Sequence, residues 1–150
     1  MSEAVLAPLA AWQNFYVIIG TAAATLTGLL FVVITLVSGA LRQVSSPWSG
    51  IRVFSTPNVM HFGAALLIAA LLSAPWPALW PAGLLVGLAG LGGVIYVFIV
   101  LWEVRHRLSY NLVLSDWLWY TLSPLLAYRA VLVGGILLPI SAALALFVIA

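Results

Sequence analysis

The stretch from Trp12 to Val37 contains no formally charged residue. At 1.5 Å per residue, a helix of this length spans about 39 Å, which is enough to cross a hydrocarbon core of about 30 Å with some tilt. A signal sequence has a shorter apolar segment of roughly 7–15 residues behind a basic start. Residues 1–9 contain Glu3 and no Lys or Arg. We therefore predict that this run is a retained first transmembrane helix.

The composition of the whole chain also indicates a membrane protein. Hydrophobic residues make up 65% of the 150 residues and charged residues 5%, whereas an average soluble domain has about 25% charged residues. Five basic and three acidic side chains cannot cover a folded domain in water. The apolar content excludes a disordered chain, and the lack of a basic stripe excludes nucleic acid as a partner. With no cysteine, disulfides and thiolate metal sites are absent, and we expect no metal or cofactor.

Three further apolar segments follow the first. In the second, Pro57 suits the first position of a helix. The uncharged linker Pro75–Pro81 is so short that the second and third helices should be antiparallel neighbours, and Pro139 should kink the fourth. We predict an all-α fold, an integral membrane four-helix bundle with short loops. Its single transmembrane domain covers residues 1–150, with spans at about 12–37, 57–74, 82–103 and 125–149.

The segment before the last span allows two interpretations. Trp117, Trp119 and Tyr120 are typical of a membrane interface, and Pro124 should bend the helix there. Residues 116–128 therefore form either a separate interfacial helix or the first turns of one long helix. The sequence does not decide between these two possibilities.

The arginines indicate the orientation. All five fall on one side of the predicted bundle: Arg42 and Arg52 in the first connection, Arg105 and Arg107 in the third, and Arg129 at the start of the fourth span. The positive-inside rule makes that side cytoplasmic. We therefore predict a multi-pass protein of the bacterial inner membrane with both termini periplasmic. Two aromatic belts agree: Trp12, Tyr16, Trp76 and Trp80 on one side, and Trp48, Trp102, Trp117 and Trp119 on the other.

One face of the first helix combines polar and small residues, which we call the Thr seam: Asn14, Thr21, Thr25, Gly28 and Thr35. At 100° per residue these positions fall within an arc of roughly 80°. A second row of small residues, Gly20, Ala24 and Gly28, lies beside it. Small residues let helix backbones approach, and threonine hydroxyls bond across helices or back to their own carbonyls. The seam is thus either a helix-packing surface or the lining of a solute path.

The third helix is rich in glycine. Gly83 and Gly87 form one GxxxG pair, and Gly90, Gly92 and Gly93 follow. Glycines in a membrane helix allow close contact with another helix, either of the same chain or of a second copy. No strand precedes these glycines and no lysine follows them, so they do not form a phosphate-binding loop. We predict a packing surface.

Ionisable residues cluster at the cytoplasmic end of the predicted bundle. We expect one polar site there, formed by His61, Glu103, Asp116, Asn58 and Arg105. His61 and Glu103 should face each other if the second and third helices are neighbours, and Asp116 is a rival partner. An ionisable residue within the membrane is a functional candidate, so the site could hold a proton or a cation, although a purely structural histidine is the simpler interpretation. Ligation of haem by His61 and His106 is a third alternative. A pH-dependent loss of thermal stability in His61→Ala tests the pairing.

No catalytic motif occurs in the chain. It contains no H-E-x-x-H, no G-x-S-x-G and no pair of acidic residues within one span. We therefore do not expect an enzyme. The predicted spans also place no charge at mid-membrane, which argues against a coupled transporter, because the binding sites of such transporters lie there. A passive pore lined by hydroxyl groups is not excluded by this reasoning.

Three segments resemble a known group of proteins: W-Q-N-F-Y-V-I-I-G (12–20), T-P-N-V-M-H-F (56–62) and D-W-L-W-Y (116–120). They are similar to segments of small bacterial multi-span membrane proteins of no assigned activity. The resemblance covers most of the chain and implies no mechanism. It implies only that His61 and Asp116 have more than an incidental role.

Two functions fit the sequence. The first is a non-catalytic accessory or regulatory subunit that docks on a larger membrane complex. The alternative is a small homo-oligomeric channel or transporter-like protein with a Thr-lined path on the first helix. A short bundle with glycine-rich faces has little interior of its own, so a homo-oligomer or a membrane-protein partner is expected in either case. The stoichiometry in mild detergent discriminates between the two.

Overall fold

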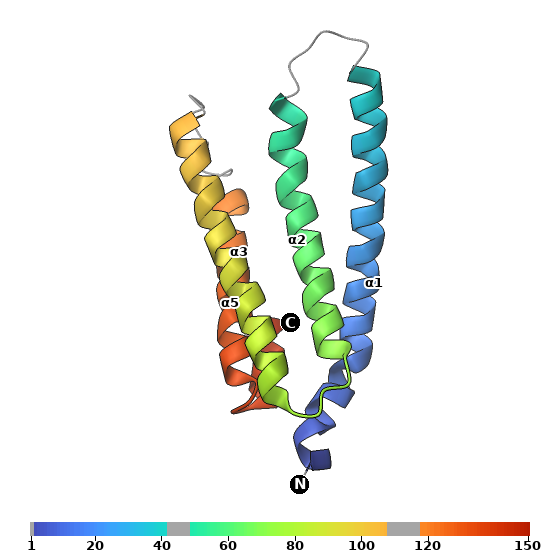
Figure 1. Ribbon diagram of the computed structural model, residues 1–150, viewed down its shortest axis with the longest axis vertical. Coiled ribbons are helices and arrows are strands. Elements are labelled where there is room, and N and C mark those ends of the chain that lie inside the picture. Colours follow the sequence, from blue (N-terminus) through green and yellow to red (C-terminus); the bar gives the residue numbers. More distant parts are fainter. Residues whose placement is uncertain (1, 42–48, 108–117) are drawn as a thin grey trace. The chain divides into compact units, whose positions relative to one another are not determined.

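A computed structural model describes residues 2–41, 49–107 and 118–150. This part of the chain is helical and contains no strand, which confirms the all-α prediction (Figure 1). The elements are α1 (Ser2–Leu41), α2 (Ser49–Ser73), α3 (Leu79–Arg107), a π-helical turn η1 (Leu118–Leu122), α5 (Ser123–Leu137) and α6 (Ala142–Ile149).

Two of these helices are long and apolar enough to cross a membrane. The segments in question are Ala7–Val37 of α1 and Leu79–Glu103 of α3. They coincide with the first and third predicted spans. The apolar stretches Pro57–Ser73 and Ser123–Leu137 are shorter.

The start of α2 differs from the prediction. The helix begins at Ser49, and Pro57 lies inside it instead of at its first position. A proline within a helix removes one backbone hydrogen bond, to the carbonyl four residues earlier. Apolar helices of the membrane-spanning kind tolerate proline more often than helices of soluble proteins do. The turn-forming residues around Pro57 were therefore a misleading signal for the helix start.

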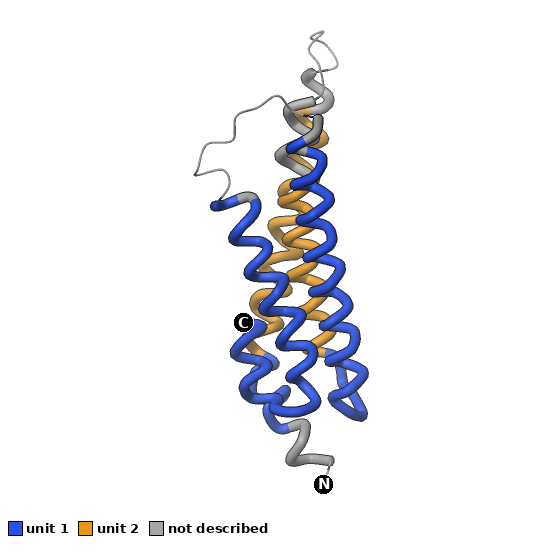
Figure 2. The backbone as a smooth tube through the Cα atoms, turned by 90° about the vertical axis from the view of Figure 1, so that its left-hand side faces the viewer, with its two compact units in different colours: residues 1–13, 74–150 blue, residues 14–73 orange. Residues whose placement is uncertain are grey.

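The chain divides into two compact units (Figure 2). The first contains residues Met1–Gln13 and Ala74–Ala150, and the second contains Asn14–Ser73. The second unit thus consists of most of α1 together with α2, while α3, η1, α5 and α6 belong to the first.

Within the second unit, one face of α1 is packed. Tyr16, Gly20 and Ala23 are buried, and Thr27 and Leu30 continue the same face half-buried. The intervals of 4, 3, 4 and 3 residues are those of a helix that packs lengthwise on another. Gly20 approaches α2: a methyl group built on it would lie 3.0 Å from Cβ of Ala69. Of the two interpretations of the small residues on α1, helix packing therefore holds at Gly20.

Within the first unit, α3 and α5 are antiparallel and touch through glycines. A methyl group on Gly83 would lie 2.6 Å from the carbonyl oxygen of Gly135, and one on Gly135 would lie 2.6 Å from Cα of Gly87. Nearer the other end, Gly93 faces the ring of Tyr128. Backbones this close leave no room for a side chain at these positions. The predicted packing role of the α3 glycines is confirmed for Gly83, Gly90 and Gly93, whereas a methyl group on Gly87 would have no neighbouring atom within 4 Å.

The predicted span over 125–149 is not one continuous helix. α5 ends at Leu137, a turn follows, and α6 folds back so that Ile149 and Ala145 lie against Gly134. Pro139 lacks the N–H that would continue the helix. The turn is instead closed by the N–H groups of Ile140 and Ser141, which donate to the carbonyl of Leu137 at 2.9 and 2.8 Å. Pro139 is therefore part of a chain reversal and not of a kink.

The segment before α5 forms part of the same helix. Leu122 has helical backbone angles, φ −69° and ψ −46°, so η1 continues into α5 without a break. Residues 118–122 are therefore the first turns of a long helix, as one of the two interpretations held; residues 116 and 117 lie outside the described residues. The helix from 118 to 137 contains 20 residues and is about 30 Å long, the thickness of a hydrocarbon core.

Candidate functional site

α5 presents two different faces. Tyr128, Val131, Gly134, Gly135 and the following Leu138 are buried. On the opposite side the exposed residues are Leu126, Arg129, Val133 and Ile136, which we call the outer α5 stripe. Its members are separated by 3, 4 and 3 residues and fall within an arc of about 80°. The stripe is apolar except for Arg129.

Arg129 lies far from both ends of its helix. It follows Leu118 by 11 residues and precedes Leu137 by 8, which corresponds to about 16 Å and 12 Å along the helix axis. A side chain at this position therefore starts near the middle of the continuous helix formed by η1 and α5.

The contacts between α3 and α5 give a second, independent measure of where Arg129 lies. A methyl group on Gly90 would lie 2.5 Å from the backbone nitrogen of Leu132 and 3.0 Å from the carbonyl oxygen of Tyr128. Gly90 is thus level with the helical turn that contains Arg129. Gly90 also lies close to the middle of the candidate span Leu79–Glu103. In a bilayer crossed by that span, Arg129 lies near the midplane.

The surroundings of Arg129 are unusual for a guanidinium group. Its side chain is exposed, and it forms no hydrogen bond or ion pair with another described residue. Its nearest neighbours in the outer α5 stripe are Leu126 and Val133. Both are hydrophobic, and their exposed fractions are 56% and 47%. A guanidinium at the centre of a bilayer costs about 2.5–3.5 kcal/mol on insertion scales and more without water or a partner.

This position differs from the predicted one. The prediction placed Arg129 at the start of a span, whereas it lies near the middle of the continuous helix over residues 118–137. The prediction differs because a span that begins at residue 125 puts the arginine near its edge. The signal that could have found the site is the interval between Trp119 and Pro139, which already has the length of one membrane crossing.

The predicted polar site around His61 is not brought together within one unit. Asn58 is exposed and His61 half-buried on α2, in the second unit. Glu103 and Arg105 are exposed on α3, in the first unit. Asp116 lies outside the described residues. The pairing of His61 with a carboxylate stays a prediction.

The Thr seam lies nearly opposite the packed face of α1. Asn14, Thr21, Thr25, Gly28 and Thr35 are all exposed. A methyl group built on Gly28 would have no neighbouring atom within 4 Å, and Ala24 is exposed as well. Of this row, only Gly20 is therefore packed within the described chain, because the helix turns Ala24 and Gly28 away from its packed face.

The threonine hydroxyls bond to their own helix. Thr21 donates to the carbonyl of Val17 and Thr25 to that of Thr21, each at 2.8 Å, and Thr35 donates to the carbonyl of Phe31 at 2.7 Å. Such bonds satisfy the hydroxyl proton without a second helix. Of the two possibilities that the sequence left open, the structure shows the bond to the helix's own carbonyl.

This geometry predicts a small effect of Thr25→Val on stability. The substitution keeps the side-chain volume and removes a hydroxyl that connects no two helices, so we expect the free energy of unfolding to change by at most about 0.5 kcal/mol. Denaturation by SDS in mixed micelles measures it. A loss of about 2 kcal/mol or more, on the order expected when a buried polar partner is left unpaired, would show that the hydroxyl also bonds to another helix.

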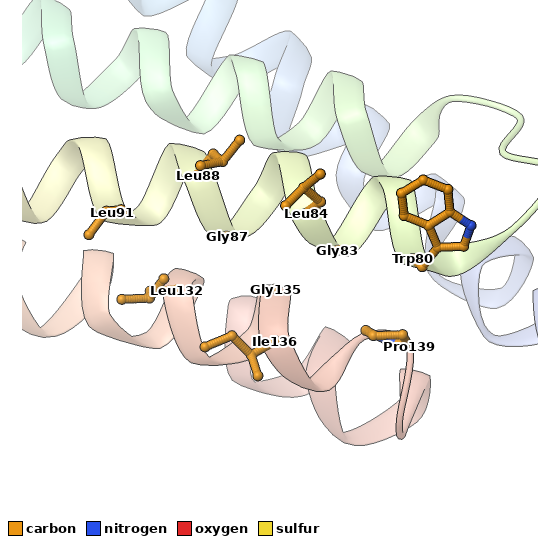
Figure 3. Close-up of a pocket in the computed structure, with 10 residues that line it drawn as sticks. All are labelled: Trp80, Gly83, Leu84, Gly87, Leu88, Leu91, Leu132, Gly135, Ile136 and Pro139. Atoms are coloured by element: carbon orange, nitrogen blue, oxygen red, sulfur yellow. The ribbon is translucent and has the colours of Figure 1, made fainter.

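A shallow apolar groove of about 530 Å³ runs along the junction of α3 and α5 (Figure 3). Trp80 and Pro139 stand at one end and Leu91 and Leu132 at the other. The full lining is Trp80, Gly83, Leu84, Gly87, Leu88, Leu91, Leu132, Gly135, Ile136 and Pro139. None of these residues is ionisable, so the groove fits hydrocarbon and not a charged solute. Ile136 belongs both to the groove and to the outer α5 stripe.

The described residues offer no assembled site for catalysis or metal binding. No group of three His, Asp or Glu side chains lies close enough together to hold a metal ion in this part of the chain, and none of its polar or charged side chains is buried. Comparisons with protein-family models, curated proteins and solved structures each give no match. Arg129 with its apolar stripe is therefore the best-defined candidate site.

Proposed function

We propose that this protein is a four-span integral membrane protein that serves as a non-catalytic accessory subunit and docks on a larger membrane complex. The observation that carries the proposal is the exposed Arg129 near the middle of the helix over residues 118–137, on a helix face that is otherwise apolar. A guanidinium in hydrocarbon needs a partner.

A membrane setting is supported by what the long helices expose. Ile18, Phe31 and Leu36 of α1 are 66%, 73% and 68% exposed. In the most apolar window of the α1 span, only 11% of the residues are buried, and in the α3 span 28%. The central helix of a soluble protein is mostly buried instead. Side chains of this kind are stable in contact with lipid or with other membrane helices.

The four spans of the proposal are α1, α2, α3 and the helix over residues 118–137. Arg42, Arg52, Arg105 and Arg107 then lie on one side, which the positive-inside rule makes the cytoplasmic side of a bacterial inner membrane. The N-terminus is periplasmic, as is the turn after Leu137. α6 re-enters the membrane from that turn, which revises the predicted periplasmic position of the C-terminus.

The Thr seam supports the second candidate, a homo-oligomeric channel. It is exposed on the side of α1 away from the packed face, so several copies could surround a path with it. The hydroxyl oxygens retain free lone pairs after donating to their own helix. In this case, Thr25→Val should reduce solute flux in reconstituted vesicles.

Purification from the native membrane in a mild detergent tests the proposed function. We expect this protein to elute with a different membrane protein at a fixed ratio, as determined by mass spectrometry and native mass measurement. A symmetric assembly of identical copies without a second component would contradict the accessory role and favour the channel.

A further inference from the structure

We infer that Arg129 pairs with a carboxylate in the middle of a partner's transmembrane helix, which docks along the outer α5 stripe. The inference rests on the proposed docking function and names the chemistry of the partner. It also assigns one helix face of this chain to the contact.

The charge of the partner follows from the depth of Arg129. Pairing with an anion removes most of the penalty of a guanidinium in hydrocarbon, and a planar guanidinium forms two parallel hydrogen bonds with one carboxylate. A carboxylate at mid-span of another helix has the same penalty on its own. Pairing therefore lowers the free-energy penalty of both groups. Apolar side chains cannot lower it, because they form no hydrogen bonds.

A second copy of this chain does not supply the carboxylate. Its acidic residues are Glu3, Glu103 and Asp116. Glu103 ends the α3 span, about 20 Å along the helix from the level of Gly90. In the sequence, Glu3 precedes the α1 span and Asp116 precedes η1. Glu103 therefore does not lie at the depth of Arg129, and in the sequence neither Glu3 nor Asp116 falls inside a proposed span, so we take the acidic side chain to come from a different protein.

The shape of the face fits a helix. Leu126, Arg129, Val133 and Ile136 repeat at the 3–4 intervals with which two helices interlock over several turns. The face is exposed, and α3 and α6 pack on the other side of α5, against Tyr128 and Gly134. The groove beside Ile136 offers further apolar surface for the flank of the same partner helix (Figure 3).

The test uses the purified full-length protein in phosphatidylcholine vesicles and two synthetic transmembrane peptides. Both peptides are Leu/Ala helices that differ only at the central residue, Glu in one and Gln in the other. The chain has no cysteine, so a dye on Ser141→Cys reports association by energy transfer. We expect the Glu peptide to bind at least about tenfold more tightly, as a charge-assisted hydrogen-bonded pair implies.

Two variants of the protein decide whether Arg129 is responsible. Arg129→Gln should bind both peptides equally, whereas Arg105→Gln, which removes an exposed charge beside the end of the α3 span, should retain the tenfold preference. Circular dichroism verifies that both variants are folded. Equal binding of the two peptides by the unmodified protein would overturn the inference, and so would a preference for Glu that survives in Arg129→Gln.

Failure of the inference is distinguishable from failure of the proposed function. A native partner that copurifies equally with the unmodified protein and with Arg129→Gln would uphold docking and refute the pairing. Absence of any native partner, together with a preference for the Glu peptide that Arg129→Gln abolishes, would refute the accessory role and leave the chemistry of Arg129 as inferred.

Discussion

Gly90→Ala should lower the free energy of unfolding by about 2–3 kcal/mol, the upper part of the usual range for overpacking. The added methyl group would meet the backbone of α5 at 2.5 Å from the nitrogen of Leu132 and 2.8 Å from its Cα. Backbone atoms of a helix cannot rotate away as a side-chain end can. α3 and α5 must therefore move apart along their glycine contact, and Tyr128 and Leu132 lose packing with them.

Gly92→Ala is the matched control for this substitution. It makes the same chemical change two residues later on the same helix, where nothing lies within 4 Å of the added methyl group. Alanine stabilises a helix by about 0.5–1 kcal/mol relative to glycine, so this variant should be as stable as the unmodified protein or more so. Denaturation by SDS in mixed micelles compares the two. Equal stability of Gly90→Ala and Gly92→Ala would show that α3 and α5 do not pack through Gly90.

The sequence predicted the helices well because their signal is local. The uncharged run from Trp12 and the stretch before Glu103 have the length and hydrophobicity of spans whatever surrounds them. The glycines of α3 likewise indicated a packing face. The sequence alone could not select which of them touch a neighbour, since Gly90 and Gly92 differ only in the direction that a helix of 3.6 residues per turn gives them.

The errors arose where a local signal has two structural outcomes. Pro57 suits the first turn of a helix and is also tolerated inside one, and Pro139 suits a kink and also a chain reversal. The reversal depends on Gly134, which allows Ala145 and Ile149 to approach α5. That contact is between two helices, so no sequence pattern within one helix predicts it.

The predicted position of Arg129 depends on the same ambiguity at Pro139. A span that begins at residue 125 leaves the arginine near its edge, whereas a span over residues 118–137 places it in the middle. The choice depends on whether the chain reverses after Leu137. The intervals of the Thr seam place its residues on one face of α1, but within the described chain the packed face is the one that carries Tyr16 and Gly20.

Cysteine labelling should distinguish a fourth span over residues 118–137 from one over residues 125–149. The expected result at each position is either full labelling or none. The chain contains no cysteine, so each single substitution reports one position. Ser141→Cys, in the exposed turn between α5 and α6, should react with a maleimide that does not cross membranes. Ala127→Cys, which is exposed on α5 near the depth of Arg129, should not react from either side of the membrane, because hydrocarbon surrounds it.

A single span over 125–149 predicts the reverse pattern. Ala127 would then lie within one turn of the membrane surface and react, whereas Ser141 would lie about 6 Å from the centre of the span, by rise per residue, and stay unlabelled. Denaturation in SDS before labelling controls for the reactivity of each thiol. Labelling of Ala127→Cys without labelling of Ser141→Cys would show that the chain does not reverse at Pro139. That result would also refute the mid-span position of Arg129 and, with that position, the need for an acidic partner.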